Sequence, residues 1–206
     1  MICYTVITKG YDDLKDPIPL EGWEYICFTD DPDLRSDVWE MRVTQKTQRQ
    51  VKIMGYEYIG NVPALYIDGS IEIIDNLDKF MMAIRKEWSV WKHPQRDCIF
   101  DEADAVVEFK GLDDAEVKKQ MLRYEALPRH WGLGQTGVMF RDFSLEWVRQ
   151  LSRLWYHEVA NGFDRDQLSL SYCAWSMGKR PHLVPNTIIC KYFKLHFHKD
   201  NLWNYG

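Results

Sequence analysis

The chain has 206 residues, and 31 acidic against 26 basic side chains give it a formal net charge of −5. This length fits one domain that buries enough surface to fold without a disulfide or a structural metal. The content of 46% hydrophobic and 28% charged residues excludes a disordered chain, and the acidic balance without a Lys/Arg block argues against duplex nucleic acid or an anionic membrane as partner.

In the first half of the chain, short apolar runs alternate with polar segments. These runs predict strands over residues 2–8, 23–28, 38–43, 64–67 and 89–92. Two helices are predicted, over residues 45–58 and 76–85. The second of these follows Asp75, which forms an N-terminal capping pattern with Asp78.

The second half of the chain carries clearer helix signals. Helices are predicted from Asp113 to about residue 126, from Ser144 to Gly162, and over residues 165–175. The first and third begin with capping boxes, formed by Asp113 with Glu116 and by Asp164 with Gln167. Further strands are predicted over residues 136–140 and 188–197.

Strands separated by helices predict an α/β fold with a mostly parallel sheet flanked by helices. No linker or internal repeat divides the chain, so residues 1–206 are expected to form a single domain, alone or within a larger protein. No apolar run approaches the ~18 residues of a transmembrane helix, and no signal peptide is expected before the first strand. An odd number of cysteines without a CxxC pair predicts free thiols and a cytoplasmic location.

Polar residues follow several of the predicted strands, where an open α/β sheet binds its ligand. They include Thr8, Tyr11 and Asp30 after the first two strands, and Asp68 after the strand over residues 64–67. A carboxylate in the position of Asp68 fits a divalent cation whose other ligands are water and phosphate, although Asp-Gly is also a common turn pair.

Basic residues on the helix before Asp68 are candidates for binding an anion. Arg49 and Lys52 are three residues apart and share a helix face, from which they can reach a pyrophosphate, although such pairs are also common on solvated surfaces. The polar run from His93 to Glu102 is equally compatible with a site and with a loop that caps a helix.

Two further candidates lie near the end of the chain. Asp166 and Gln167 open a predicted helix, where the helix dipole favours a carboxylate but does not require one. His196 and His198 are two residues apart in a predicted strand and therefore share a face, as metal ligands or as ordinary surface histidines. Dinucleotide-binding, P-loop, zinc-protease and serine-hydrolase motifs do not occur.

The order of these segments resembles that of a glycosyltransferase. The matching segments are YTVITKGYD (4–12), CFTDD (27–31), ALYIDGSI (64–71), HPQRDCIFDE (93–102), GLGQTGVMFR (132–141) and RDQLS (165–169). In this order they resemble GT-A enzymes, and more narrowly the small glycosyltransferase-like family of bacteria, large viruses and plant mucilage-related proteins. The resemblance implies a single Rossmann-like GT-A domain that transfers a sugar from a nucleotide sugar, in the first place a UDP-sugar, to a glycan or another hydroxyl acceptor.

The resemblance also implies Mn²⁺ or Mg²⁺ on the diphosphate of the donor. Asp68 falls where the family keeps a DxD-like metal carboxylate, but Gly69 and Ser70 follow it instead of a second aspartate. A C-terminal histidine completes the metal site in related enzymes, and His196 and His198 are in a suitable place in the chain.

The remaining roles follow from the same resemblance. Nucleotide contacts are expected from Thr8, Tyr11, Asp30, Arg49, Lys52 and Asp68. Sugar and acceptor contacts are expected from His93, Arg96, Gln135, Thr136 and Gln167. Asp166 is the expected catalytic carboxylate, with Asp97 and then Glu102 in reserve. A non-catalytic module that binds a nucleotide sugar or a glycan is the alternative, whereas no nucleophile or zinc motif supports a hydrolase.

Overall fold

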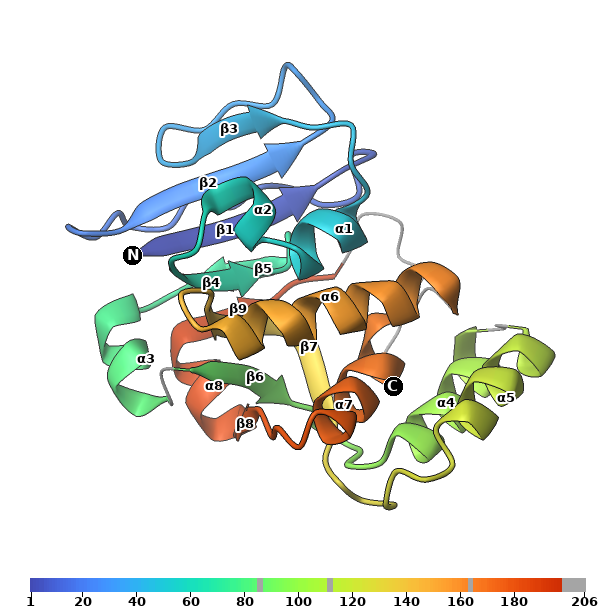
Figure 1. Cartoon of the computed structure of the whole chain (residues 1–206). Helices are drawn as coiled ribbons and strands as arrows, with labels where there is room; N and C mark the ends of the chain where they lie inside the picture. Colours follow the sequence, from blue (N-terminus) through green and yellow to red (C-terminus); the bar gives the residue numbers. More distant parts are fainter. Residues whose placement is uncertain (85–86, 111–112, 163–164, 198–206) are drawn as a thin grey trace.

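The computed structural model describes residues 1–84, 87–110, 113–162 and 165–197. Its centre is a seven-stranded sheet with the order β3-β2-β1-β4-β7-β6-β8 (Figure 1). The strands of this sheet are β1 (Ile2–Ile7), β2 (Glu24–Thr29), β3 (Glu40–Val43), β4 (Pro63–Ile67), β6 (Trp88–Lys92), β7 (Gly134–Asp142) and β8 (His182–Val184).

Most neighbouring strands of the sheet are parallel. Strand β1 is parallel to β2 and β4, β2 is parallel to β3, and β6 is parallel to β8. Strand β7 is the exception, because it runs antiparallel to both β4 and β6. The predicted mostly parallel α/β sheet is therefore confirmed.

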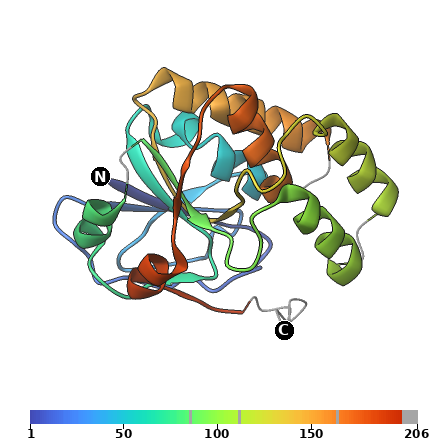
Figure 2. The same ribbon diagram turned by 90° about the horizontal axis from the view of Figure 1, so that it is seen from below.

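Helices cover both faces of this sheet. The helices are α1 (Gln48–Ile53), α2 (Tyr56–Ile59), α3 (Leu77–Ala83), α4 (Ile99–Lys110), α5 (Asp114–Arg123), α6 (Glu146–Asn161), α7 (Asp166–Ser176) and α8 (Asn186–Tyr192). Helices α1, α2 and α6 lie over one face, while α3 and α8 lie over the other (Figures 1 and 2). Helices α4 and α5 form a hairpin at one end of the molecule, beside α7.

Alternation along the strands builds two separate apolar cores. On β1, Cys3 and Ile7 pack in the core that includes Phe80 of α3. The intervening side chain of Tyr4 points to the other core, which includes Trp155 of α6. This alternation explains why a strand in the middle of the sheet is apolar throughout, since both of its faces are covered.

Two expectations about local structure were wrong in detail, and a third was not tested. The helix expected over residues 45–58 is divided into α1 and α2 at Met54 and Gly55. Gly55 packs directly on Tyr4, where a Cβ atom would lie 2.7 Å from Tyr4 Cζ. Helix α3 is capped by Asn76 rather than Asp75, since Asn76 Oδ1 accepts a hydrogen bond from the Lys79 amide. The capping box with Asp164 involves a residue outside the described ranges, and α7 begins after Arg165.

The tail was predicted as one strand, but residues 186–192 form helix α8. Ile189 and Phe193 are four residues apart and pack in the same core, which satisfies a helical period as well as a strand period. Only β9 (Phe193–Leu195) of the predicted segment is a strand, and it pairs antiparallel with β5 (Ile71–Ile73) in a second, two-stranded sheet.

Within the described ranges, no helix is both long and apolar enough to cross a membrane. The five cysteines are free thiols, and Cys3 and Cys27 are buried as the apolar runs around them predicted. The topology brings the carboxyl ends of β1, β2, β4 and β6 to one edge of the sheet. Because β7 is antiparallel, its first residues lie at the same edge, and the candidate site is built there.

Candidate active site

A cavity of about 930 Å³ opens at this edge of the sheet. It is lined by the ends of β1 and β4, by α1, by the start of β7, by the start of α7 and by the segment after β9. The predicted site residues that line it are Thr8, Tyr11, Asp30, Arg49, Lys52, Asp68, His93, Gln135, Thr136, Asp166, Gln167 and His196. Arg96 and Asp97 lie outside this lining, and His198 lies outside the described residues.

The centre of the cavity is a buried lysine that pairs with two carboxylates. Lys52 Nζ lies 2.9 Å from Asp166 Oδ2 and 3.2 Å from Asp68 Oδ1. It also donates to Thr136 Oγ1 over 3.1 Å, and Thr136 Oγ1 donates in turn to Asp166 Oδ2 over 2.8 Å. Arg49 Nη1 is 3.3 Å from the same Asp166 oxygen. Five predicted residues from four segments of the chain thus form one network of charges and hydrogen bonds.

Helix α1 positions the cations of this network. Thr47 caps the helix, since Thr47 Oγ1 accepts a hydrogen bond from the Gln50 amide over 3.2 Å. At the other end of the helix, Tyr4 donates to the Lys52 carbonyl over 2.9 Å and Arg141 donates to the Ile53 carbonyl over 2.8 Å. Both ends of the short helix are therefore fixed by side chains, which holds Lys52 over the sheet edge.

Asp166 is ionised although it is almost fully buried. Burial by itself would raise the pKa of the Asp166 carboxyl, but the charges of Arg49 and Lys52 and the hydrogen bond from Lys52 hold that pKa well below its ordinary value. The backbone carbonyl of Asp166 accepts a hydrogen bond from Trp155 Nε1 over 2.9 Å, which ties the start of α7 to α6. The carboxylate is consequently a fixed negative charge and a weak base.

Asp68 presents its two oxygens to different surroundings. Oδ1 accepts from the Tyr66 hydroxyl over 2.5 Å and pairs with Lys52. The pKa of Tyr66 lies well above its usual value because the ring is buried and faces the charge of Asp68. Oδ2 lies beside Gly137, where a Cβ atom would be only 3.2 Å away.

The glycines beside Asp68 create room for a second carboxylate. A Cβ atom on Gly69 would lie 2.9 Å from Asp12 Oδ2, so only glycine lets the loop after β1 approach this closely. Asp12 and Asp68 are hard oxygen donors that together match the few protein ligands of Mn²⁺ or Mg²⁺ on a diphosphate. The donor set at this end of the cavity therefore fits a hard divalent cation.

The segment after β9 adds a histidine to the same end of the cavity. The His196 amide donates to the Ser70 carbonyl over 2.8 Å, which brings the histidine next to the loop that carries Asp68. His196 Nε2 lies 2.7 Å from Glu72 Oε2, so Nδ1 is the nitrogen that remains for a ligand.

The loop after β1 is folded by local hydrogen bonds. Asp30, which follows β2, accepts two hydrogen bonds from the Lys9 amide over 2.9 and 3.0 Å. Lys9 has a φ of 58°, and the Tyr11 amide donates to the Thr8 carbonyl over 3.2 Å. Asp30 thus shapes the loop that brings Tyr11 to the cavity.

A buried glutamate organises the opposite side of the cavity. Glu102 on α4 lies 2.6 Å from Arg96 Nε, 3.1 Å from Arg165 Nη2 and 3.5 Å from His93 Nε2. Burial acts to raise the pKa of Glu102, but the charges of Arg165, His93 and Arg96 outweigh it and the pKa is lowered. Arg96 therefore supports the site through Glu102 instead of lining the cavity. Arg165 was not predicted as a site residue. Its position directly before Asp166 in the sequence was the feature that could have indicated it.

Two polar atoms of residues in the lining are buried without a partner. Among the residues that the structure describes, neither Gln135 Oε1 nor Arg165 Nε has a hydrogen-bond partner. Both atoms are shut off from solvent, so they do not face the open cavity themselves. Unpaired buried groups of this kind are costly.

Asp97 lies apart from this arrangement. Its carboxylate is at the surface, where Oδ1 is 2.6 Å from His130 Nδ1. The side chain of Asp97 is 54% exposed, against 3% for Asp166, so the two carboxylates are in opposite environments.

A family profile described as the TOD1/MUCI70 glycosyltransferase-like domain matches residues 63–198, about two thirds of the chain. The matched range includes Asp68, Thr136 and Asp166, while the cations Arg49 and Lys52 lie before it. No curated protein matches the chain. Because this profile matches more than half of the sequence, the chain belongs to the TOD1/MUCI70 glycosyltransferase-like family.

Proposed function

We propose that this protein is a glycosyltransferase that transfers a sugar from a nucleotide sugar, in the first place a UDP-sugar, to a hydroxyl group of a glycan or another acceptor. The observation that carries the proposal is the buried network of Lys52 with Asp68 and Asp166 inside a cavity at the carboxyl ends of the strands. An open α/β sheet binds nucleotides at this edge.

The charges of the cavity support an anionic donor. Its lining holds five Lys or Arg residues and four Asp residues, although the whole chain has a net charge of −5. We propose that Arg49 and Lys52 face the diphosphate, and that the loop with Thr8, Tyr11 and Asp30 holds the nucleoside. The Tyr11 ring offers a flat apolar face for a base.

The reaction breaks the bond between the anomeric carbon and the diphosphate oxygen, and forms a bond from that carbon to the acceptor oxygen. The electron pair of the broken bond leaves with the nucleoside diphosphate, and the proton of the acceptor hydroxyl passes to the departing diphosphate or to water. Cations fixed beside the diphosphate stabilise the charge that develops there without reorganising during the reaction. Lys52 and Arg49 are already fixed by Asp166 and by helix α1.

Asp166 acts as a fixed negative charge in this proposal. Because its pKa is low, it is a poor general base, but it remains ionised beside a sugar ring that gains positive charge. We propose that sugar hydroxyls contact the polar residues of the lining, which include Gln135, Arg165, His93, Thr136 and Gln167.

Asp68, Asp12 and His196 are the residues that would hold Mn²⁺ or Mg²⁺. The cation would neutralise part of the diphosphate charge and make it a better leaving group. Lys52 shares Asp68 with that cation, so the protein supplies positive charge at this point in any case. The five free cysteines agree with a cytoplasmic location, which we also propose.

Titration calorimetry with UDP tests the proposal, with and without Mn²⁺. We expect UDP to bind and Mn²⁺ to strengthen the binding. Lys52→Met should weaken UDP binding by at least about tenfold, which is the loss of one charge-assisted contact of ~1.4 kcal/mol. Lys118→Met, on the exposed face of α5, is the matched control and should bind as the unchanged protein does.

Donor hydrolysis separates an enzyme from a binding module. The protein is incubated with UDP-glucose, UDP-galactose or UDP-N-acetylglucosamine, and released UDP is measured. Asp166→Asn should retain UDP binding and lose UDP release, whereas the surface control Asp114→Asn should keep both. Binding without release from any donor would favour the non-catalytic alternative, and the absence of UDP binding would overturn the proposal.

A further inference from the structure

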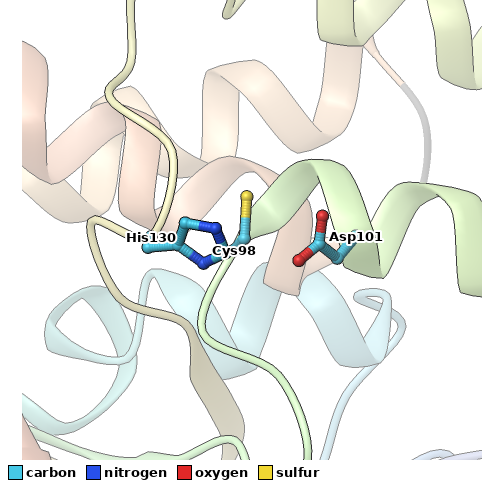
Figure 3. Close-up of side chains that lie close together, drawn as sticks. All are labelled: Cys98, Asp101 and His130. Carbon is cyan, nitrogen blue, oxygen red and sulfur yellow. The ribbon is translucent and has the colours of Figure 1, made fainter.

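Outside the lining of the active-site cavity, three side chains of the metal-binding types face one another. Cys98, Asp101 and His130 each offer one potential ligand atom, and these atoms all lie within 4.8 Å of one another (Figure 3). Cys98 is buried and directly precedes α4, Asp101 lies in the first turn of that helix, and His130 belongs to the loop between α5 and β7.

The histidine of this cluster is already oriented by a carboxylate. His130 Nδ1 lies 2.6 Å from Asp97 Oδ1, which leaves Nε2 as the nitrogen for a ligand. A metal-bound histidine usually gives its other ring nitrogen to a carboxylate in this way, which fixes the ring and its tautomer. The loop is fixed at the same point, because the Gly132 amide donates to the Asp97 carbonyl over 3.0 Å.

The mixture of ligands selects the kind of cation. A set with one thiolate, one imidazole and one carboxylate suits a borderline divalent ion better than Mg²⁺ or Ca²⁺, which take oxygen ligands. Zinc ligands lie about 2.0 to 2.3 Å from the ion, so a tetrahedral ion needs ligand atoms less than about 4 Å apart. The present separations, all within 4.8 Å, exceed that distance by less than about 1 Å. Arg129 Nη1, 3.4 Å from Asp101 Oδ1 at the surface, is the neighbour that Asp101 would give up.

We propose that Cys98, Asp101 and His130 form a binding site for Zn²⁺ or a similar divalent ion, with water as the fourth ligand. The ion would fasten the loop between α5 and β7 to the start of α4. Because α4 also carries Glu102, which holds His93 and Arg165, the ion would stabilise one wall of the active-site cavity from outside it. Its role is structural and does not depend on the proposed reaction.

Cobalt absorption tests the site on the whole chain. The protein is treated with a chelator, returned to a buffer with excess Mg²⁺ that saturates oxygen-only sites, and titrated with Co²⁺. A thiolate ligand gives a charge-transfer band in the near ultraviolet, which no oxygen ligand produces. We expect this band at one equivalent, its loss on addition of Zn²⁺, and a rise in Tm with Zn²⁺, because the ion binds the folded state.

Three variants assign the signal to its ligands. Cys98→Ala should abolish the band, and His130→Asn should weaken Zn²⁺ binding at least about tenfold. Asn suits the latter position because His130 has a φ of 57°, where asparagine is tolerated. Cys190→Ala removes an exposed cysteine elsewhere and should leave the band unchanged. If Cys98→Ala does not fold, His130→Asn alone decides the case.

Three results would overturn the proposal. The unchanged protein could give no band, the band could survive in Cys98→Ala, or only Cys190→Ala could weaken it. Binding of UDP with Mn²⁺ serves as an independent readout. Cys98→Ala and His130→Asn should retain it, so that loss of the zinc site is distinguishable from loss of the proposed active site.

Discussion

Asp166 and Glu102 are buried carboxylates that are kept ionised by basic neighbours, and this determines how the protein responds to acid. Both have a lowered pKa in the folded state. Such a group stabilises the fold at every pH above its unfolded pKa of about 4, and the contribution is lost as the pH falls towards the folded pKa. We therefore expect the free energy of unfolding to fall from about pH 5 downward, as the two carboxylates become protonated.

Urea denaturation between about pH 6 and pH 3 measures this loss. Glu102→Gln should be less stable than the unchanged protein at pH 6, and the difference should shrink as the pH approaches 3, because the Glu102 contribution is then lost in both proteins. Asp114→Asn serves as the control, because Asp114 is an exposed carboxylate whose ion pair is with the exposed Lys118. Equal pH dependence of the unchanged protein and Glu102→Gln would contradict this account.

Site residues were predictable from the sequence where a local signal marked them. Asp68 follows directly after a buried strand, and Arg49 and Lys52 share one helix face, so all three were expected to lie near a diphosphate, although the ion pair of Lys52 with Asp68 was not itself predicted. The group around Glu102 was not predictable, because Glu102 and Arg165 are 63 residues apart and meet only through the packing of α4 beside α7. Asp97 and Glu102 were equivalent in the sequence, and only burial separates them.

At the scale of the elements, a buried arginine supports the end of helix α1. Arg141 is fully buried on β7, where it donates to the carbonyls of Lys52 and Ile53 and to the Tyr4 hydroxyl. Burial lowers the pKa of Arg141, and the nearby Tyr4 and Tyr66 oppose this shift. The guanidinium caps the last carbonyls of the helix that carries the cations of the site.

Arg141→Met should therefore weaken both the fold and the site. The Lys52 carbonyl keeps the hydrogen bond from Tyr4, but the buried Ile53 carbonyl loses the donor that Arg141 supplies. One such group costs about 1 to 3 kcal/mol, which is the loss that we expect in the free energy of unfolding. UDP affinity should fall as well, because Lys52 is no longer held in place. Urea denaturation and titration calorimetry measure the two effects.

Two further variants interpret that result. Arg153→Met removes an exposed arginine of α6 that pairs with Glu146, and should change stability by less than about 1 kcal/mol. Arg141→Lys keeps the charge but not the planar fork, so it should recover only part of the stability. Unchanged stability and UDP binding in Arg141→Met would show that helix α1 does not depend on this contact.

Most elements were predictable because burial imposes a clear period on them. Residues on α6 recur at helical spacing, and Val148, Leu151 and Trp155 are fully buried as expected. The failures have local causes, since three-residue strands such as β5 and β8 are too short to show any period. The tail over residues 186–195 was ambiguous for a similar reason, because Ile189 and Phe193 fit either period.

At the scale of the molecule, the fold separates stability from function. Two apolar cores on opposite faces of the sheet stabilise the domain, and the charged network lies at the sheet edge between them. The parallel arrangement of β1, β2 and β4 makes this possible, because it brings loops from distant parts of the sequence to one place. The sheet order and the antiparallel β7 depend on non-local pairing, which no local pattern of the sequence specifies.

The net charge of the chain and the charge of its cavity have opposite signs. The dependence of donor affinity on salt concentration shows which of the two governs binding. A net charge of −5 repels an anionic nucleotide, and added salt would screen that repulsion and strengthen binding. The excess of Lys and Arg in the cavity attracts the nucleotide, and added salt would weaken that attraction. Arg49 and Lys52 are close to the proposed diphosphate site, whereas most of the negative charge is farther away and is already screened over the Debye length of about 8 Å at physiological ionic strength.

We therefore expect the local cations to dominate. The Kd for UDP, measured by calorimetry with EDTA present to exclude metal ions, should rise several-fold between about 50 mM and about 500 mM NaCl. Arg49→Met should reduce this salt dependence, because one of the attracting charges is gone, while Lys118→Met on distant α5 should leave it unchanged. Binding that strengthens with salt would mean that the whole-chain charge outweighs the cavity, and that the diphosphate does not lie beside Arg49 and Lys52.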